Sequence, residues 1–186
     1  MPPRNLLTGE FAVLSLLRIE PMYGYQMAHY FDEGDLAEVF PIEQSLLYTY
    51  LRNVQNRGLV TWSEVRVGLR PPRKLFALTP AARVLIDEWL RMPVERMREV
   101  RLELLIKLYV LELTDPPAAR ELLQRQVDVC EAYQLRITAR VAESTGFRRL
   151  VAQSKLTAAE STARWLRSYS PEPGDQQASP ERITIE

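Results

Sequence analysis

The sequence of 186 residues contains one cysteine and one histidine, Cys130 and His29. A single cysteine cannot form an intrachain disulfide, and one cysteine with one histidine cannot complete a zinc site at any usual spacing. No apolar run approaches the length of a membrane span, and the N-terminus lacks the apolar core and cleavage site of a signal peptide. The sequence therefore predicts a cytoplasmic protein with no metal, no disulfide and no membrane partner.

Motifs of catalysis are also missing. The sequence has no Gly-rich phosphate loop, no dinucleotide fingerprint and no zinc motif, and its one histidine belongs to no recognised catalytic pattern. We therefore predict no catalytic residue and no cofactor, and we do not expect an enzyme. Cys130 is interpreted as a buried structural thiol and His29 as a residue of a helix surface.

Charge is balanced overall, with 24 basic and 24 acidic residues, but it is unevenly distributed. Residues 1–39 hold two basic and six acidic side chains, a net charge of −4. Residues 40–83 hold seven basic and two acidic side chains, a net charge of +5. A basic segment within a neutral protein is typical of a localised contact with nucleic-acid phosphates.

Three short helices joined by short turns are predicted in the first sixty residues. Apolar residues at helical spacing predict a first helix over 8–19, with Thr8 as its N-cap. A second helix is expected over about 23–31 and a third over about 43–57, with Gly58 as the C-cap. This arrangement is typical of a helix-turn-helix core.

After Gly58 the pattern changes from helical to extended. The runs LVTWSEV and RKLFALT are rich in residues that favour strands and are separated by a loop with glycine and proline, which predicts a two-stranded wing. Thr79 and Pro80 then predict the N-cap and the first residue of a fourth helix. The predicted fold is mainly α with a small β-hairpin, and its N-terminal winged helix-turn-helix domain covers residues 1–92.

The rest of the chain is predicted to form a helical dimerisation domain over residues 93–169. One helix has a heptad seam, and a last helix over about 147–169 has small residues along one side. The polar, proline-containing tail over 170–186 is expected to be disordered. The predicted dimer-interface residues are Leu123, Val127, Cys130, Gln134, Ile137, Val141 and Trp165.

Three consecutive segments resemble the PadR family of winged-helix transcriptional regulators. They are FAVLSLLRIEPMYGYQM for the first two helices, LLYTYLRNVQNRGLV for the recognition helix, and PPRKLFALTPAA for the return strand of the wing. The resemblance covers residues 6–90, and beyond Pro93 only the organisation resembles the longer C-terminal domain of some members. It implies a homodimeric DNA-binding regulator, more often a repressor than an activator. Some relatives bind a small aromatic or drug-like effector, and no residue here decides whether this chain does.

The third helix and the wing carry the candidate DNA contacts. When Leu47, Leu51 and Val54 face the core, the helical period turns a polar set to the opposite side, where glutamine can pair with adenine and arginine with guanine. Four cations within nine residues of the wing, with no acid between them, predict contacts with phosphates or the minor groove. The predicted DNA-binding residues are Gln44, Ser45, Tyr48, Thr49, Arg52, Arg66, Arg70, Arg73 and Lys74.

Two other interpretations stay open. The winged helix could be a scaffold for protein interaction or small-molecule binding without specific DNA reading, and the chain could be a purely structural helical dimer. In the DNA-binding interpretation, a symmetric dimer reads double-stranded DNA at two half-sites of a palindromic operator, roughly 34 Å apart. This interpretation requires the acidic first forty residues to face away from the DNA.

Overall fold

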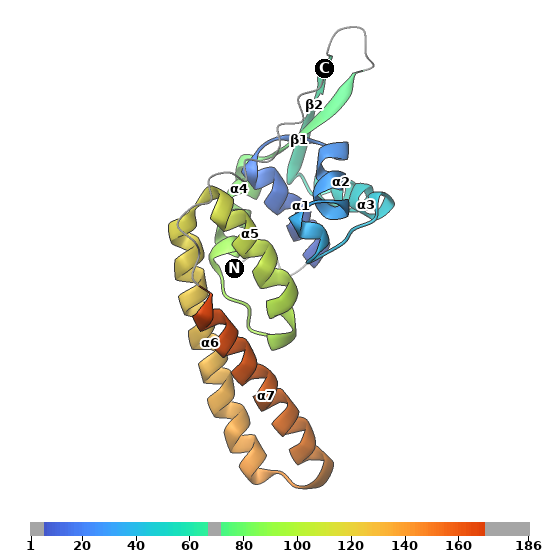
Figure 1. Cartoon of the computed structure of the whole chain (residues 1–186). Helices are drawn as coiled ribbons and strands as arrows, with labels where there is room; N and C mark the ends of the chain where they lie inside the picture. Colours follow the sequence, from blue (N-terminus) through green and yellow to red (C-terminus); the bar gives the residue numbers. More distant parts are fainter. Residues whose placement is uncertain (1–5, 67–71, 170–186) are drawn as a thin grey trace. The chain divides into compact units, whose positions relative to one another are not determined.

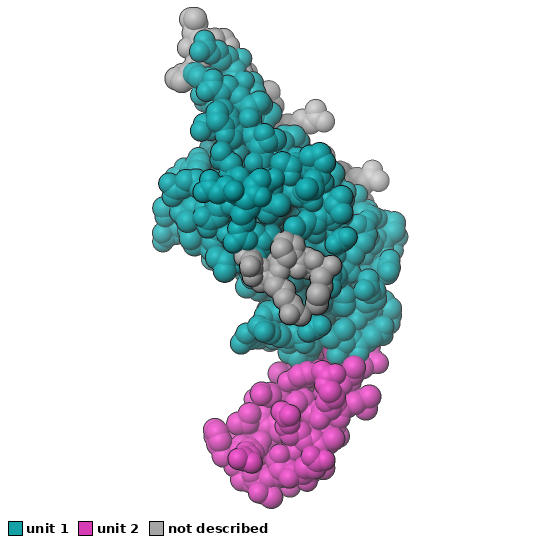
Figure 2. Space-filling model, turned by 180° about the vertical axis from the view of Figure 1, so that it is seen from behind, with its two compact units in different colours: residues 1–129 teal, residues 130–186 magenta. Residues whose placement is uncertain are grey.

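The computed structural model describes residues 6–66 and 72–169 (Figure 1). The chain forms two compact units, residues 1–129 and 130–186, which Figure 2 colours separately. The predicted division after residue 92 therefore does not coincide with the division by compactness, and it stays a prediction about function. Arg70 and the predicted disordered tail lie outside the described residues. No helix in the described part of the chain is long and apolar enough to span a membrane.

The first unit begins with the three predicted helices, α1 (Thr8–Ile19), α2 (Gly24–Asp32) and α3 (Gln44–Asn56), with a short 3-10 helix (Asp35–Ala37) between the last two. The N-cap of α1 is Leu7 rather than the predicted Thr8. The backbone N–H of Leu7 donates a hydrogen bond to the Glu10 carboxylate at 3.0 Å, so a side chain within the helix satisfies this group. The apolar side of α1 is buried together with Leu47, Leu51 and Val54 of α3.

The sheet has three strands, β1 (Met22–Tyr23), β2 (Val60–Val65) and β3 (Arg73–Leu78), in the antiparallel order β1-β3-β2. The prediction of a two-stranded hairpin missed β1, because two residues are too short to show an alternating pattern. Figure 1 shows β2 and β3 extending as a ribbon beyond the helices. The predominantly helical fold with a small antiparallel sheet is otherwise as predicted.

A fourth helix, α4 (Pro80–Arg91), follows the wing, and the Thr79 hydroxyl accepts a hydrogen bond from the Ala82 N–H at its start, as predicted. A 3-10 turn (Met97–Glu99) and a π-helical turn (Val100–Leu104) then lead into α5 (Leu105–Thr114). The rings of Phe11 and Trp89 stack with their centroids 4.5 Å apart, which joins α1 to α4.

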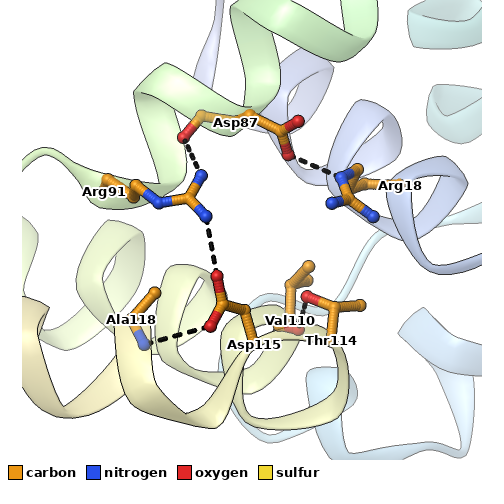
Figure 3. Close-up of polar contacts among 7 residues, drawn as sticks. All are labelled: Arg18, Asp87, Arg91, Val110, Thr114, Asp115 and Ala118. Atoms are coloured by element: carbon orange, nitrogen blue, oxygen red, sulfur yellow. Dashed lines mark hydrogen bonds and ion pairs between the residues drawn. The ribbon is translucent and has the colours of Figure 1, made fainter.

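A polar network ties α1, α4 and the start of α6 together within the first unit (Figure 3). Asp87 of α4 pairs with Arg18 of α1, and the backbone carbonyl of Asp87 accepts from Arg91. The Arg91 guanidinium also pairs with Asp115 at 2.7 Å, and Asp115 accepts from the Ala118 N–H. The last turn of α4 is therefore held from two sides by charged side chains.

The long helix α6 (Pro116–Glu143) is followed by α7 (Gly146–Ser168), and the part of α6 from residue 130 onward forms a hairpin with α7 in the second unit. Gln134 Nε2 donates to the Ala159 carbonyl oxygen at 3.1 Å, and Arg167 pairs with Glu131. Alanines at 152, 159 and 163 are buried, so the backbones of the two helices approach closely.

Most of the predicted dimer-interface residues already have contacts within a single chain. Leu123, Val127, Cys130 and Ile137 are buried, and Gln134 is bonded to α7 of the same chain. Their role in a dimer interface stays a prediction. The heptad pattern indicated a helix packed along another helix, but spacing alone cannot tell a helix of the same chain from a helix of a partner. Val141 is half-buried and Trp165 is exposed.

Candidate nucleic-acid interface

The exposed face of α3 presents most of the predicted base contacts. Gln44, Ser45 and Arg52 are exposed, whereas Thr49 is half-buried. Because Leu47, Leu51 and Val54 are buried on the opposite side, Ser45, Thr49 and Arg52 share the outward face of the helix, as the helical period predicts. Gln44 does not lie on this face: it precedes Leu51 by seven residues, and it is exposed because it is the first residue of the helix.

Two side-chain hydrogen bonds run along this face. Thr49 Oγ1 donates to the Ser45 carbonyl oxygen at 3.0 Å, and Arg52 Nη2 donates to Thr49 Oγ1 at 3.3 Å. The guanidinium of Arg52 therefore has a preferred orientation before any ligand binds. An orienting bond of this kind lowers the entropy lost when a long side chain makes a specific contact.

Tyr48 has a second role that its position on the helix did not indicate. A Cβ atom at Gly24 would lie 2.7 Å from the Tyr48 hydroxyl oxygen, so this ring packs directly over the glycine at the start of α2. The side chain is 38% exposed, which leaves part of the ring available at the surface. Tyr48 therefore sets the approach of α2 to α3, and any side chain at position 24 would displace it.

The C-terminus of α3 is fixed to the base of the wing. Gly58 has φ of +70°, and the Leu59 N–H donates to the Val54 carbonyl oxygen at 3.0 Å, which closes the helix with a left-handed residue. The Thr79 hydroxyl donates to the carbonyl oxygens of Gly58 and Leu59 at 3.1 and 3.3 Å. The recognition helix and the wing are thus held together at one point.

Two cations of the wing, Arg73 and Lys74, lie over aromatic rings. The Arg73 guanidinium lies 5.3 Å from the centroid of Tyr25 in α2, and the Lys74 ammonium lies 4.1 Å from the centroid of Trp62 in β2. Both cations are exposed, as is Arg66. Since neighbouring residues of a strand point to opposite faces, Arg73 and Lys74 address different sides of the ribbon. Lys74 is also opposite Glu64 in the strand register, which offsets part of its charge.

A hollow of about 260 Å³ lies beside the first residue of α3. Asp32, Glu33 and His29 of α2 and its end line it together with Gln44. The Nδ1 atom of His29 is 3.1 Å from a Glu33 carboxylate oxygen. Asp32 and Glu33 therefore lie beside Gln44, and the expectation that the acidic residues face away from the predicted DNA contacts is not met at these two positions.

An outward polar face on the third helix, a basic two-stranded ribbon and a helix-turn-helix core define a winged helix-turn-helix protein of the nucleic-acid-binding class. Residues 13–88 match the model of the transcriptional regulator PadR-like family. This part of the chain belongs to that family. Because the family is one of transcriptional regulators, the prediction that the chain is not an enzyme is confirmed. Residues 100–170 match a second model, described as the C-terminal region of virulence activator alpha.

One curated protein and several solved structures are similar to this chain. The negative transcriptional regulator PadR of Bacillus subtilis (strain 168) is 24% identical over 123 residues, which cover 66% of this chain and 67% of that protein. The crystal structure of Bacillus subtilis PadR in complex with operator DNA is similar with a TM-score of 0.44 and 22% identity, over 86% of this chain and 95% of that one. Its complex with p-coumaric acid is similar with a TM-score of 0.42 and 22% identity, over 87% of this chain and 96% of that one.

The sequence did not predict the contacts that hold α3 and the wing in place. Tyr25 beneath Arg73, Gly24 beneath Tyr48 and Glu10 beside Asn53 join segments that are far apart along the chain. No local pattern marks such pairs, because periodicity describes one element at a time. Only an alignment with covarying positions could have found them from sequence.

Proposed function

We propose that the chain is a sequence-specific DNA-binding transcription regulator that reads an operator as a homodimer, most simply as a repressor. Gln44, Ser45, Thr49 and Arg52 contact base edges or nearby phosphates in a major groove, with Tyr48 at the margin of that surface. Arg66, Arg73 and Lys74 contact the backbone beside it, and Arg70, outside the described residues, is proposed to join them. The observation that carries this proposal is the oriented polar face of α3 next to an exposed basic ribbon.

The charge of this surface supports DNA over a protein partner. Arg73 and Lys74 lie over aromatic rings and form no salt bridge within the described residues, although Glu64 is the cross-strand neighbour of Lys74. Cations held in this way keep their charge available for phosphate and release counterions when DNA binds. Cations that only keep a protein soluble have no need of a fixed position over an aromatic ring.

The homodimer is proposed to form through the second unit. Along α7 the residues at a spacing of three and four are exposed and uncharged: Phe147, Leu150, Ser154, Ala158, Ser161 and Trp165. Phe147 is 78% exposed and Leu150 is 60% exposed. An exposed uncharged stripe with heptad spacing, and with large apolar side chains at both ends, supports packing against the same stripe of a second chain. Trp165 thus keeps its predicted role, and the other residues of the stripe are proposed to join it.

The operator is expected to be an imperfect palindrome, with half-sites roughly 34 Å apart, because a two-fold dimer presents two copies of α3. The chain is proposed to act in the cytoplasm, the compartment in which it would bind its operator. A small aromatic or drug-like effector is a candidate second ligand, and it would have to bind one dimer geometry better than another to change the affinity for DNA. The p-coumaric acid complex of the Bacillus subtilis relative supports testing a phenolic acid first.

Fluorescence-anisotropy titration tests this function. The purified chain is titrated against a duplex from upstream of its own gene and against a scrambled duplex, each at several salt concentrations. We expect tighter binding to the upstream duplex, weakening linearly in the logarithm of salt concentration. Equal and weak binding to both duplexes at every salt concentration, with and without a phenolic acid, would contradict the proposal and favour a protein-interaction scaffold.

A further inference from the structure

The contact between α1 and α3 is unusually close and contains a buried carboxylate. Glu10 is 1% exposed, and one of its carboxylate oxygens accepts a hydrogen bond from Asn53 Nδ2 of α3 at 3.0 Å. The other oxygen accepts from the Leu7 N–H at 3.0 Å and lies 4.0 Å from Arg57 Nη1. A carboxylate buried at this level is retained only where hydrogen bonds and charge compensate for the loss of water.

Gly9, the residue before Glu10, also contacts α3. A Cβ atom at Gly9 would lie 2.3 Å from the ring of Tyr50, so the backbone of α1 touches this ring directly. Gly9 and Glu10 therefore contact two consecutive turns of α3, at Tyr50 and at Asn53. Since Ser45, Thr49 and Arg52 lie on the outward face of the same helix, a rotation about its axis would move every one of them.

We infer that Glu10 and Asn53 are positioning residues for DNA recognition. Their buried hydrogen bond fixes the rotation of α3 about its axis and its position along that axis, and so orients its outward face toward the base edges. The inference rests on the proposed function. Neither residue touches DNA. Their effect is on discrimination between sequences, because base-edge contacts require a fixed geometry whereas phosphate contacts tolerate small shifts.

The hydrogen bond from Asn53 to Glu10 can be removed by one substitution and restored in the reverse direction by a second. Asn53→Asp places two carboxylates in contact and removes the only donor of the pair, so α3 must move. Glu10→Gln combined with Asn53→Asp restores the bond in the reverse sense, because the glutamine amide donates to the carboxylate introduced in α3 and its oxygen still accepts from the Leu7 N–H. Glu10→Gln alone also keeps the bond, since the Asn53 amide can turn and present its oxygen.

The experiment measures affinity of the full chain for the duplex that the wild type prefers and for its scrambled control, at a temperature where circular dichroism shows each variant to be folded. We expect Asn53→Asp to weaken binding to the preferred duplex by about tenfold, as for one lost base contact, and to leave scrambled DNA within about twofold. The double variant is expected to return to within about twofold of the wild type. Gln153→Glu, the same change from amide to carboxylate at an exposed position of α7, is the matched control and should have no effect.

A loss of folded protein cannot imitate this result. Partial unfolding lowers the concentration of competent chains and reduces the affinity for both duplexes by the same factor. An unchanged ratio of the two affinities in Asn53→Asp, or a double variant no better than Asn53→Asp, would overturn the inference while leaving the proposed function intact. A wild-type chain that does not discriminate between the duplexes would overturn the proposed function, and the positioning role with it.

Discussion

The two compact units of the chain differ in the polar groups that they bury and in the arrangement of their exposed apolar side chains. The first unit buries Glu10, Lys107 and Gln126 in its interior and exposes cations on its wing. The second unit buries alanines between α6 and α7, and α7 exposes Phe147, Leu150 and Trp165 along one side. Buried charge with partners inside the unit needs no second chain, whereas large apolar side chains aligned along one exposed face are typical of a surface that another chain covers. The two functions proposed for this chain, DNA binding and dimerisation, therefore correspond to two different kinds of surface.

The strongest test of this contrast adds charge to the apolar surface of the second unit. Phe147→Asp with Leu150→Asp is expected to convert the dimer to a monomer, because two carboxylates would be buried without partners. Loss of the linked second half-site should weaken operator binding by about 100-fold. Size-exclusion chromatography with light scattering gives the mass, and anisotropy gives the affinity.

The matched control for that test is Val84→Asp in α4, where the side chain is 61% exposed in the first unit. It should leave both mass and affinity unchanged. A double variant that remains dimeric would show that the α7 stripe is not the interface, and the contrast between the units would then lose its functional meaning.

A charge reversal in the wing should have the next largest effect. Arg73→Glu with Lys74→Glu is expected to weaken binding to any duplex by about tenfold at low salt and to lower the salt slope by about 2, one for each phosphate contact. The control makes the same change of charge at Arg96 and Arg98, which are exposed in the segment after α4. If both pairs of reversals have equal effects, the wing acts only through net charge.

Buried charge in the first unit makes a prediction about pH. Burial lowers the pKa of Lys107 from its ordinary value of 10.5, and the neighbouring Glu103 carboxylate offsets part of this shift. Between the lowered pKa and 10.5 the unfolded chain binds the proton and the folded chain does not, so the free energy of unfolding rises with pH through that window.

We expect Lys107→Met to lack this rise, which amounts to at most about 1.4 kcal/mol for each pH unit. Urea unfolding of both proteins at several pH values above neutrality measures the difference, and titration of other groups cancels between them. A constant stability difference across the window would mean that Lys107 keeps its proton in the fold. The ammonium would then be held by Glu103, the Met92 carbonyl and the Trp89 ring.

The smallest effect on DNA affinity is expected for a substitution on the outward face of α3. Thr49→Val removes the hydroxyl that orients Arg52 but keeps the shape of the side chain. Because Arg52 can still reach the DNA without its preferred orientation, and Thr49 loses no more than one hydroxyl contact, we expect a decrease of about twofold to threefold in the affinity for the preferred duplex. Arg52→Ala should cost more, about tenfold, because it removes the guanidinium itself.

Much of the first unit was predictable because its signals are local. Periodicity predicted α1, α2 and α3 to within a residue or two, and Gly58 and Thr79 marked the ends of helices through their own backbone and hydroxyl chemistry. The exposed set on α3 followed from three buried positions and the pitch of a helix. Strand β1 could not be predicted, since its two residues become a strand only by pairing with Phe76 and Leu75 of β3.

The sequence by itself determined the main helices, the two strands of the wing and the polar outward face of α3, because each of these depends on residues within a few positions of one another. Tertiary structure alone decided that the α6 seam packs inside the chain, that Tyr48 lies over Gly24, and that Glu10 bonds Asn53. These contacts join residues separated by up to 43 positions in the chain. A periodic pattern states that a face is buried, and only the packing of elements in three dimensions states against what.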